Sequence, residues 1–219
     1  MRTTRLAPCI AVLGTTALVG LGLAGCSSGT HAAAPSTTAT AGRTAAAAPQ
    51  GLAAKLLTAA DLPSGWGLEA TATNPEMSTQ CPVLNSTVWN APLPDHAEVD
   101  LSAGLTGPVL VEQLAGGDSQ QVDKAWTAFV AAIPQCSTYS HAGSSGSSTF
   151  TVTSIDFPKY GEASYGFALS VGVTSGVGGT GNIVVARTGA AVVMLIVVGV
   201  GGVPKTLMEQ IAAKAVAKA

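Results

Sequence analysis

Charged residues are scarce in this chain, and it has no surplus of positive charge. Lys and Arg total 10 against 12 Asp and Glu, so the formal net charge of the 219 residues is −2. This balance excludes a basic surface for nucleic acid. It also excludes a polybasic patch that would attract the chain to an anionic membrane. We therefore expect no nucleic-acid partner.

Sequence motifs for common hydrolases are also absent from the expected folded domain. Residues 51–219 contain no Gly-x-Ser-x-Gly segment and no His-Glu-x-x-His segment, which are typical of serine hydrolases and zinc proteases. The glycine-rich segment 176–181 lacks the following Lys and helix start of a phosphate-binding loop. We expect a hairpin loop there.

Three polar residues alternate along one predicted strand. His96, Glu98 and Asp100 would share one face of that strand, where they could form a metal or acid–base site. A solvated strand face is the preferred interpretation, because no second group of ligands follows. His31 and His141, in predicted tether and loop segments, are expected to lie at the surface. We therefore predict a non-enzyme with no catalytic residues, no metal and no cofactor.

The first 25 residues have the pattern of a signal peptide. Arg2 and Arg5 precede an uncharged, apolar run over 6–23, as in secretory signals. The run ends in Leu23–Cys26, whose order of small residues before a cysteine is similar to a lipobox. We expect cleavage before Cys26, and attachment there of a lipid carrying fatty acids such as palmitate. A transmembrane anchor, or a secreted chain with a free Cys26, are the alternatives.

The residues after Cys26 divide into a tether and a domain. Residues 26–50 hold the lipidated cysteine and a polar, Ala-rich stretch that cannot bury enough apolar surface to order itself. As a flexible coil this stretch would span about 25–30 Å. Residues 51–219 are long enough for one stable domain. Without residues 1–25 the net charge is −4, so lipid on Cys26 must provide the membrane attachment.

Four cysteines in the sequence leave one pair to account for. Cys9 is removed with the signal and Cys26 is lipidated, so Cys81 and Cys136 remain. In an oxidising compartment an even pair is typical of a disulfide. Closing a loop of this length would stabilise the fold by about 4 kcal/mol. A metal pair and a reactive thiol are the other interpretations.

Hydrophobic periodicity predicts an α+β fold in which an antiparallel β-sheet is packed with helices. The segment 190–200 is apolar on both faces, which predicts a central strand covered on both sides. Residues 74–94 are expected to be mostly loop. The expected elements are a short helix at 52–60, strands at 98–106 and 108–115, a helix begun by Ser119 and stopped by Pro134, strands at 149–157, 163–174, 182–188 and 190–200, and a helix at 205–218.

Two features could form a ligand site. One face of the predicted strand 163–174 carries only small residues, which leaves room for a close helix or a ligand. Four aromatic residues are candidates for lining an apolar pocket, although ordinary core packing would also explain them. They are Trp66, Trp89, Tyr160 and Tyr165.

Three segments resemble a known group of proteins. Leu56–Trp66, the helix ending at Cys136, and Asn182–Gly189 are similar to segments of actinobacterial lipoproteins and of the sensor-like extracellular domain of PknH-type Ser/Thr kinases. The resemblance implies an antiparallel sheet packed with helices, disulfides, and a cleft for an unidentified ligand. This chain departs from the kinase ectodomain in having only one candidate disulfide and no kinase domain.

Together these observations predict an extracytoplasmic lipoprotein held at the cell membrane by its lipid. The expected function is a non-catalytic binding or sensor-like module for an envelope ligand, which could be apolar or a lipid. A structural or assembly factor with a protein partner is the alternative, and an envelope hydrolase is a third.

Overall fold

The computed structural model describes residues 50–69, 81, 84, 92–143, 146–174, 176 and 178–219. The side chains of residues 141–143 and 146 are not included. The predicted signal peptide, the tether with Cys26, and Trp89 lie outside the described residues. Within these residues, no helix combines the length and apolar character that crossing a bilayer requires.

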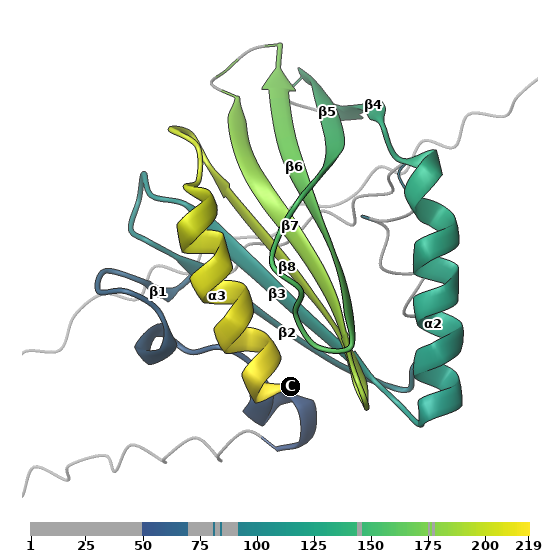
Figure 1. The fold of residues 1–219 in the computed structure, drawn as a ribbon. Helices are drawn as coiled ribbons and strands as arrows, with labels where there is room; N and C mark the ends of the chain where they lie inside the picture. The colour runs from purple at the N-terminus through teal and green to yellow at the C-terminus, as the bar shows by residue number, and fades with distance from the viewer. Residues whose placement is uncertain are drawn as a thin grey trace, which may run out of the picture. The chain divides into compact units, whose positions relative to one another are not determined.

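The described residues form one antiparallel sheet with a helix on each side (Figure 1). The strand order is β1-β2-β3-β8-β7-β6-β5-β4. The chain runs through the short helices η1 (Gly51–Lys55) and η2 (Ala59–Asp61), strands β1 (Gly67–Leu68), β2 (Asp95–Ser102) and β3 (Val109–Gly116), helices α2 (Ser119–Ala132) and η3 (Ile133–Gln135), strands β4 (Thr138–Gly143), β5 (Gly146–Ile155), β6 (Ala163–Val173), β7 (Gly179–Thr188) and β8 (Ala191–Gly199), and helix α3 (Lys205–Lys218).

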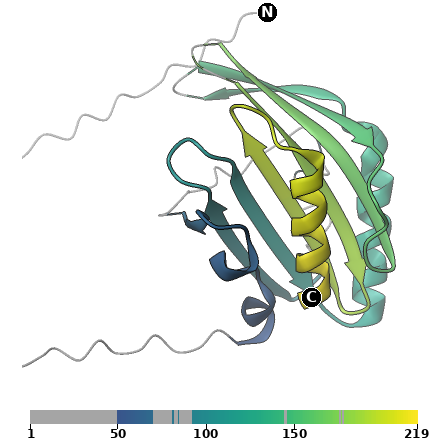
Figure 2. The same ribbon diagram turned by 60° about the vertical axis from the view of Figure 1, so that its left-hand side comes forward.

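Strand β8 is buried on both faces, as its sequence predicts. It pairs with β3 and β7 near the middle of the sheet. Val192 and Met194 point into one hydrophobic cluster, whereas Val193 and Leu195 point into another. Because neighbouring side chains of a strand face opposite sides, the sheet separates two cores. Helix α2 belongs to the first and α3 to the second (Figure 2).

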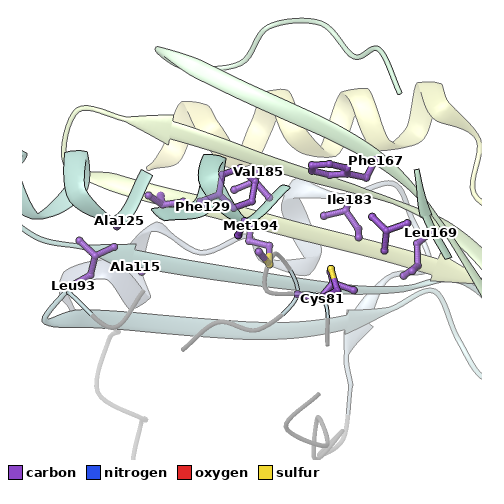
Figure 3. Close-up of a cluster of buried hydrophobic side chains, with 14 of the residues drawn as sticks. Cys81, Leu93, Ala115, Ala125, Phe129, Phe167, Leu169, Ile183, Val185 and Met194 are labelled. Atoms are coloured by element: carbon purple, nitrogen blue, oxygen red, sulfur yellow. The ribbon is translucent and has the colours of Figure 1, made fainter. Parts of the chain in front are cut away.

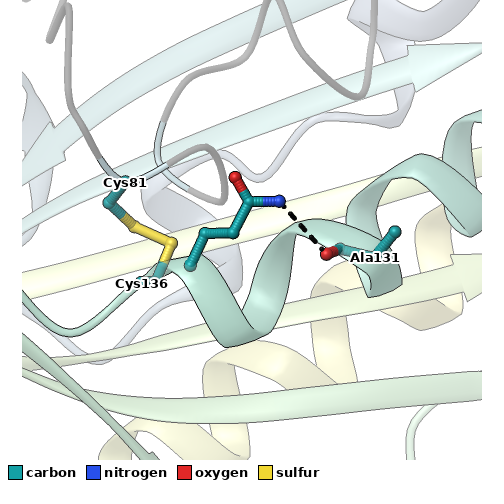
Figure 4. The surroundings of a disulfide bond; sticks show 4 residues. Cys81, Ala131 and Cys136 are labelled. Atoms are coloured by element: carbon teal, nitrogen blue, oxygen red, sulfur yellow. Dashed lines mark hydrogen bonds between the residues drawn. A yellow bond between two sulfur atoms is a disulfide. The ribbon is translucent and has the colours of Figure 1, made fainter.

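The core on the α2 side joins the helix to strands β5–β8 (Figure 3). Val122, Ala125 and Phe129 recur at helical spacing and are fully buried. The disulfide between Cys81 and Cys136 is present, which confirms the predicted pair. It links the segment around residue 81 to the end of α2 and η3, with the two Cα atoms 4.6 Å apart (Figure 4).

The core on the α3 side covers β3, β8 and β7. Met208, Ile211 and Ala215 of α3 are buried there. The N-terminal segment packs against the same core through Leu56 and Leu57. Hydrogen bonds from Lys218 Nζ to Leu56 O (2.5 Å) and to Asp61 Oδ2 (2.6 Å) tie that segment to the end of α3.

Several local features differ from those predicted from the sequence. The predicted helix over 52–60 is two short 3₁₀ turns, η1 and η2. Asp118, rather than Ser119, caps α2, and its carboxylate accepts from the backbone N–H of Gln121. Strands β1 and β4 were not predicted. They are an edge strand of two residues and a polar strand with little apolar alternation, so neither gives a clear periodic signal.

A buried carboxyl group lies beneath the N-terminal segment. Glu112 of β3 is 0% exposed, and its Oε2 accepts a hydrogen bond of 2.6 Å from the backbone N–H of Leu57. Among the described residues, Oε1 has no hydrogen-bond partner. Burial raises the pKa of Glu112 to about 7, although the Leu57 N–H and the nearby Lys218 lower it. Between pH 4.5 and about 7, Glu112 in the α3-side core therefore keeps its proton in the folded protein, whereas the same group has lost its proton in the unfolded chain.

Glu112 predicts a pH dependence of stability. Between pH 4.5 and about 7 the unfolded chain releases this proton and the folded protein keeps it, so the free energy of unfolding falls as pH rises. The total decrease from this group is about 3 kcal/mol. Urea denaturation across this range should show the slope in wild type and lose it in Glu112→Gln. Equal slopes in the two proteins would contradict the assignment to Glu112.

Candidate functional site

Helix α3 covers only part of its side of the sheet. Its buried residues pack with those of β3, β8 and β7, whereas strands β4, β5 and β6 extend beyond it (Figure 1). On the opposite side, the same three strands contribute Tyr139, Val152 and Phe167 to the core beneath α2. The outer strands are therefore apolar on one side and open on the other.

Small polar side chains occupy the open side. Thr138 of β4 pairs with Thr151 of β5, Thr151 with Ser170 of β6, and Ser170 with Thr180 of β7. Because directly paired residues of antiparallel strands face the same side, these four hydroxyls form one row across four strands. We call the open side of β4–β7 the hydroxyl face. Its polar side chains include Thr138, Ser140, Thr149, Thr151, Thr153, Ser170, Thr180 and Asn182.

A hollow of about 300 Å³ lies in the hydroxyl face, beside the loop that leads into α3. That volume is at the lower end of the range for small-molecule pockets, roughly 300–1,000 Å³. It therefore fits a small ligand or one unit of a longer one. The lining residues are Thr151, Thr153, Ala168, Leu169, Ser170, Thr180, Gly181, Asn182 and Val203.

Asn182 forms the inner wall of the hollow. It is 7% exposed and donates a hydrogen bond of 3.2 Å from Nδ2 to the carbonyl of Val203. This bond holds the loop before α3 against β7. The Asn182 carboxamide is therefore a polar lining group of the hollow whose position is fixed by the protein.

The hollow has no charged lining residue. Strands β4, β5, β6 and β7 together contain a single charged residue, Arg187. Arg187 points to the α2 side, where its guanidinium pairs with Asp123 of α2 at 2.6 Å and with Glu162 at 3.0 Å. The hollow therefore presents neutral hydroxyl and amide groups and a few apolar side chains.

The small-residue face of β6 is divided between packing and open space. A Cβ on Gly166 would lie 2.1 Å from the ring of Phe157, so this glycine admits an aromatic side chain from the segment after β5. Ala168 and Ser170 line the hollow. A Cβ on Gly172 would meet only one atom, at 3.8 Å. A side chain from a loop, rather than a helix, therefore covers one end, and the remainder is open.

The aromatic candidates are not brought together. Trp66 and Tyr160 pack in the α3-side core, and the Tyr160 hydroxyl donates to the carbonyl of Glu209. Tyr165 lies on the α2 side, with its ring 5.8 Å from that of Trp126. None of these three residues lines the hollow. Their role as ligand contacts stays a prediction, as does that of Trp89, which lies outside the described residues.

The polar residues of β2 share a face, as expected. Register places His96 opposite Ala115, Glu98 opposite Gln113 and Asp100 opposite Val111. Glu98 Oε2 accepts a hydrogen bond of 2.6 Å from Gln113 Nε2. Across the described residues, no three His, Cys, Asp or Glu side chains lie close enough to hold a metal ion.

Two loop predictions need correction. His141 lies in strand β4, where it pairs with Ser148, and not in a loop. The segment 176–181 is only partly a loop, since β7 begins at Gly179. Thr180 therefore belongs to the strand and adds its hydroxyl to the row. Sequence reasoning missed the hydroxyl face for this reason, although the alternation of Thr151 and Thr153 with Phe150 and Val152 was a signal for it.

Comparison with known proteins identifies a shared fold. No family model matches the sequence, and no curated protein matches it. The structure is similar to that of the extracellular domain of PknH from Mycobacterium tuberculosis, with a TM-score of 0.51 and 11% sequence identity. The match covers 70% of this chain and 80% of that domain. At this identity the likeness shows the fold alone, a sheet-and-helix architecture that an extracellular domain also uses.

Proposed function

We propose that this protein is a lipid-anchored extracytoplasmic binding module that captures a small envelope ligand in the hollow of its hydroxyl face. The hollow carries the proposal, because it combines open volume with a lining of hydroxyl groups and the mostly buried amide of Asn182, which is fixed by its bond to the Val203 carbonyl. Binding sites typically combine a concave surface with a few placed polar groups.

The chemistry of the hollow favours binding over catalysis. Its polar lining consists of Thr, Ser and Asn side chains. A hydroxyl becomes a nucleophile only beside a general base, and the lining includes no His, Asp, Glu or Lys. The carboxyl group whose pKa burial raises, Glu112, is completely buried on β3 in the core beneath α3. Hydrogen-bonding recognition is thus what these side chains perform best.

The membrane location rests on the N-terminal sequence. The lipobox-like segment ending in Cys26 supports cleavage and lipid attachment, and the disulfide of Cys81 and Cys136 is consistent with an oxidising compartment. As a flexible coil, a tether of the length of residues 27–50 would have a typical end-to-end distance of about 25–30 Å.

A protein partner is the second candidate, and one observation favours it. Leu105, between β2 and β3, and Val200, after β8, are large apolar residues that are highly exposed. The two loops lie at the same end of the sheet, because Val109 pairs with Val198. Exposed apolar groups at neighbouring loops are typical of a contact surface.

Substitution of Cys26 tests the anchor. The full chain with Cys26→Ala should lose its thioether-linked lipid and leave the membrane fraction, because no basic patch holds it there. Metabolic labelling with a fatty acid and fractionation of the envelope measure both effects. Cys9→Ala is the matched control and should be labelled and retained as wild type. Retention of unlabelled Cys26→Ala in the membrane would contradict the lipid anchor.

Substitution of Ser170 tests the hollow. Full-length protein purified from its own envelope in mild detergent should carry a bound small molecule that mass spectrometry detects. Ser170→Trp places a large ring in the hollow and should reduce its amount at least tenfold. Ser154→Trp, at an exposed serine on the other side of β5, should retain it. An empty wild-type protein, or equal occupancy in both variants, would contradict binding at the hollow.

A further inference from the structure

We propose that the ligand of the hollow is a neutral saccharide, either free or as the headgroup of a glycolipid. This inference rests on the proposed function, since it names the chemical class that the hollow binds. The three observations that carry it are the hydroxyl row, the absence of charge from the hollow lining, and the Asn182 amide that the Val203 carbonyl holds in place.

The spacing of the hydroxyl row suits a polyhydroxylated ligand. Thr151, Ser170 and Thr180 lie on successive strands, and neighbouring strands are about 4.8 Å apart. Each hydroxyl both donates and accepts hydrogen bonds. A sugar ring presents the same kind of group around its edge, so one ring can bond to two neighbouring strands.

The lack of charge selects against ionic ligands. A phosphate, carboxylate or ammonium group that enters the hollow would lose water without gaining a charged partner, which is costly. The nearest charged residue by strand position, Arg187, is paired with Asp123 on the opposite side of the sheet. Neutral hydroxyls exchange hydrogen bonds with water for hydrogen bonds with protein at little net cost.

The apolar and amide side chains that line the hollow also suit a sugar ring. Ala168 and Val203 add small apolar contacts among the polar groups, which suits the C–H faces of a sugar ring. Asn182 is held by its bond to the Val203 carbonyl, which fixes its amide at the hollow. An acyl chain would offer the amide and the hydroxyls no hydrogen bond, so lipid tails fit the hollow less well than sugar.

Removal of single hydroxyls tests the ligand class. Full-length lipoprotein in nanodiscs is titrated with neutral gluco-, manno-, galacto- and arabino-pentasaccharides, and with pentagalacturonic acid as the charged counterpart. At least one neutral sugar should bind, and the charged sugar should bind at least tenfold more weakly. Thr151→Val and Thr180→Val preserve shape and should each weaken neutral-sugar binding about fivefold. Thr127→Val, on the exposed surface of α2, is the matched control and should not change it. Thermal denaturation checks that each variant is folded.

The outcomes separate this inference from the proposed function. Binding of none of the neutral sugars at 10 mM would overturn the saccharide assignment. So would a preference for pentagalacturonic acid over all of the neutral sugars. If the co-purified molecule nevertheless depends on Ser170, the hollow remains the binding site and only the ligand class is wrong. If no neutral sugar binds and no co-purified molecule depends on Ser170, both proposals are overturned.

Discussion

The burial of β8 on both faces is the constraint on which the rest of the structure depends. A strand with Val, Met, Leu and Ile on both sides requires an apolar layer above and below the sheet. Helix α2 provides one layer and helix α3 the other. Each helix has 14 residues, and a helix is only about 10 Å across. One helix therefore cannot cover the width of a sheet of eight strands, which are spaced about 4.8 Å apart.

Each helix leaves part of the sheet uncovered, and the two sides of the sheet differ in what occupies the uncovered part. This difference produces the candidate site. Beneath α2, large side chains such as Phe150, Val152 and Phe167 extend the core outward to β5. The disulfide holds Cys81 in the same core. On the α3 side, the N-terminal segment instead packs with β3 and β8. The outer strands there carry hydroxyls, which tolerate exposure, and the hollow lies where the covered and open parts of this side meet.

Strong periodic signals made most of the fold predictable. The apolar run of β8, the spacing of Val122 and Phe129 in α2, and the terminal helix over 205–218 lie where the sequence placed them. The cysteine pair was predictable because only Cys81 and Cys136 remained once Cys9 and Cys26 were assigned. Strand β4 and η1 were not predictable, because pairing with β5 decides the structure of the first and packing against β2 and β3 that of the second, and local propensity does not.

The site was less predictable than the fold, for a physical reason. Aromatic residues attracted attention because they are large, yet Trp66 and Tyr160 fill the core. The hydroxyl row depends on the register between four strands, and a shift of one residue would turn every hydroxyl to the other side. Composition can suggest that a strand has a small, polar face. Only strand pairing shows that Thr151, Ser170 and Thr180 stand beside one another.

Thiol labelling in the intact envelope tests most directly whether the hydroxyl face is a binding surface. Single cysteines are introduced by Ser170→Cys in the hollow and Ser154→Cys on the other side of the sheet, and both are treated with a membrane-impermeant maleimide. We expect Ser170→Cys to react several-fold more slowly in cells than after purification and removal of bound ligand, whereas Ser154→Cys reacts equally in both states. The same rate for Ser170→Cys in cells and in the stripped protein would contradict an occupied site on this face.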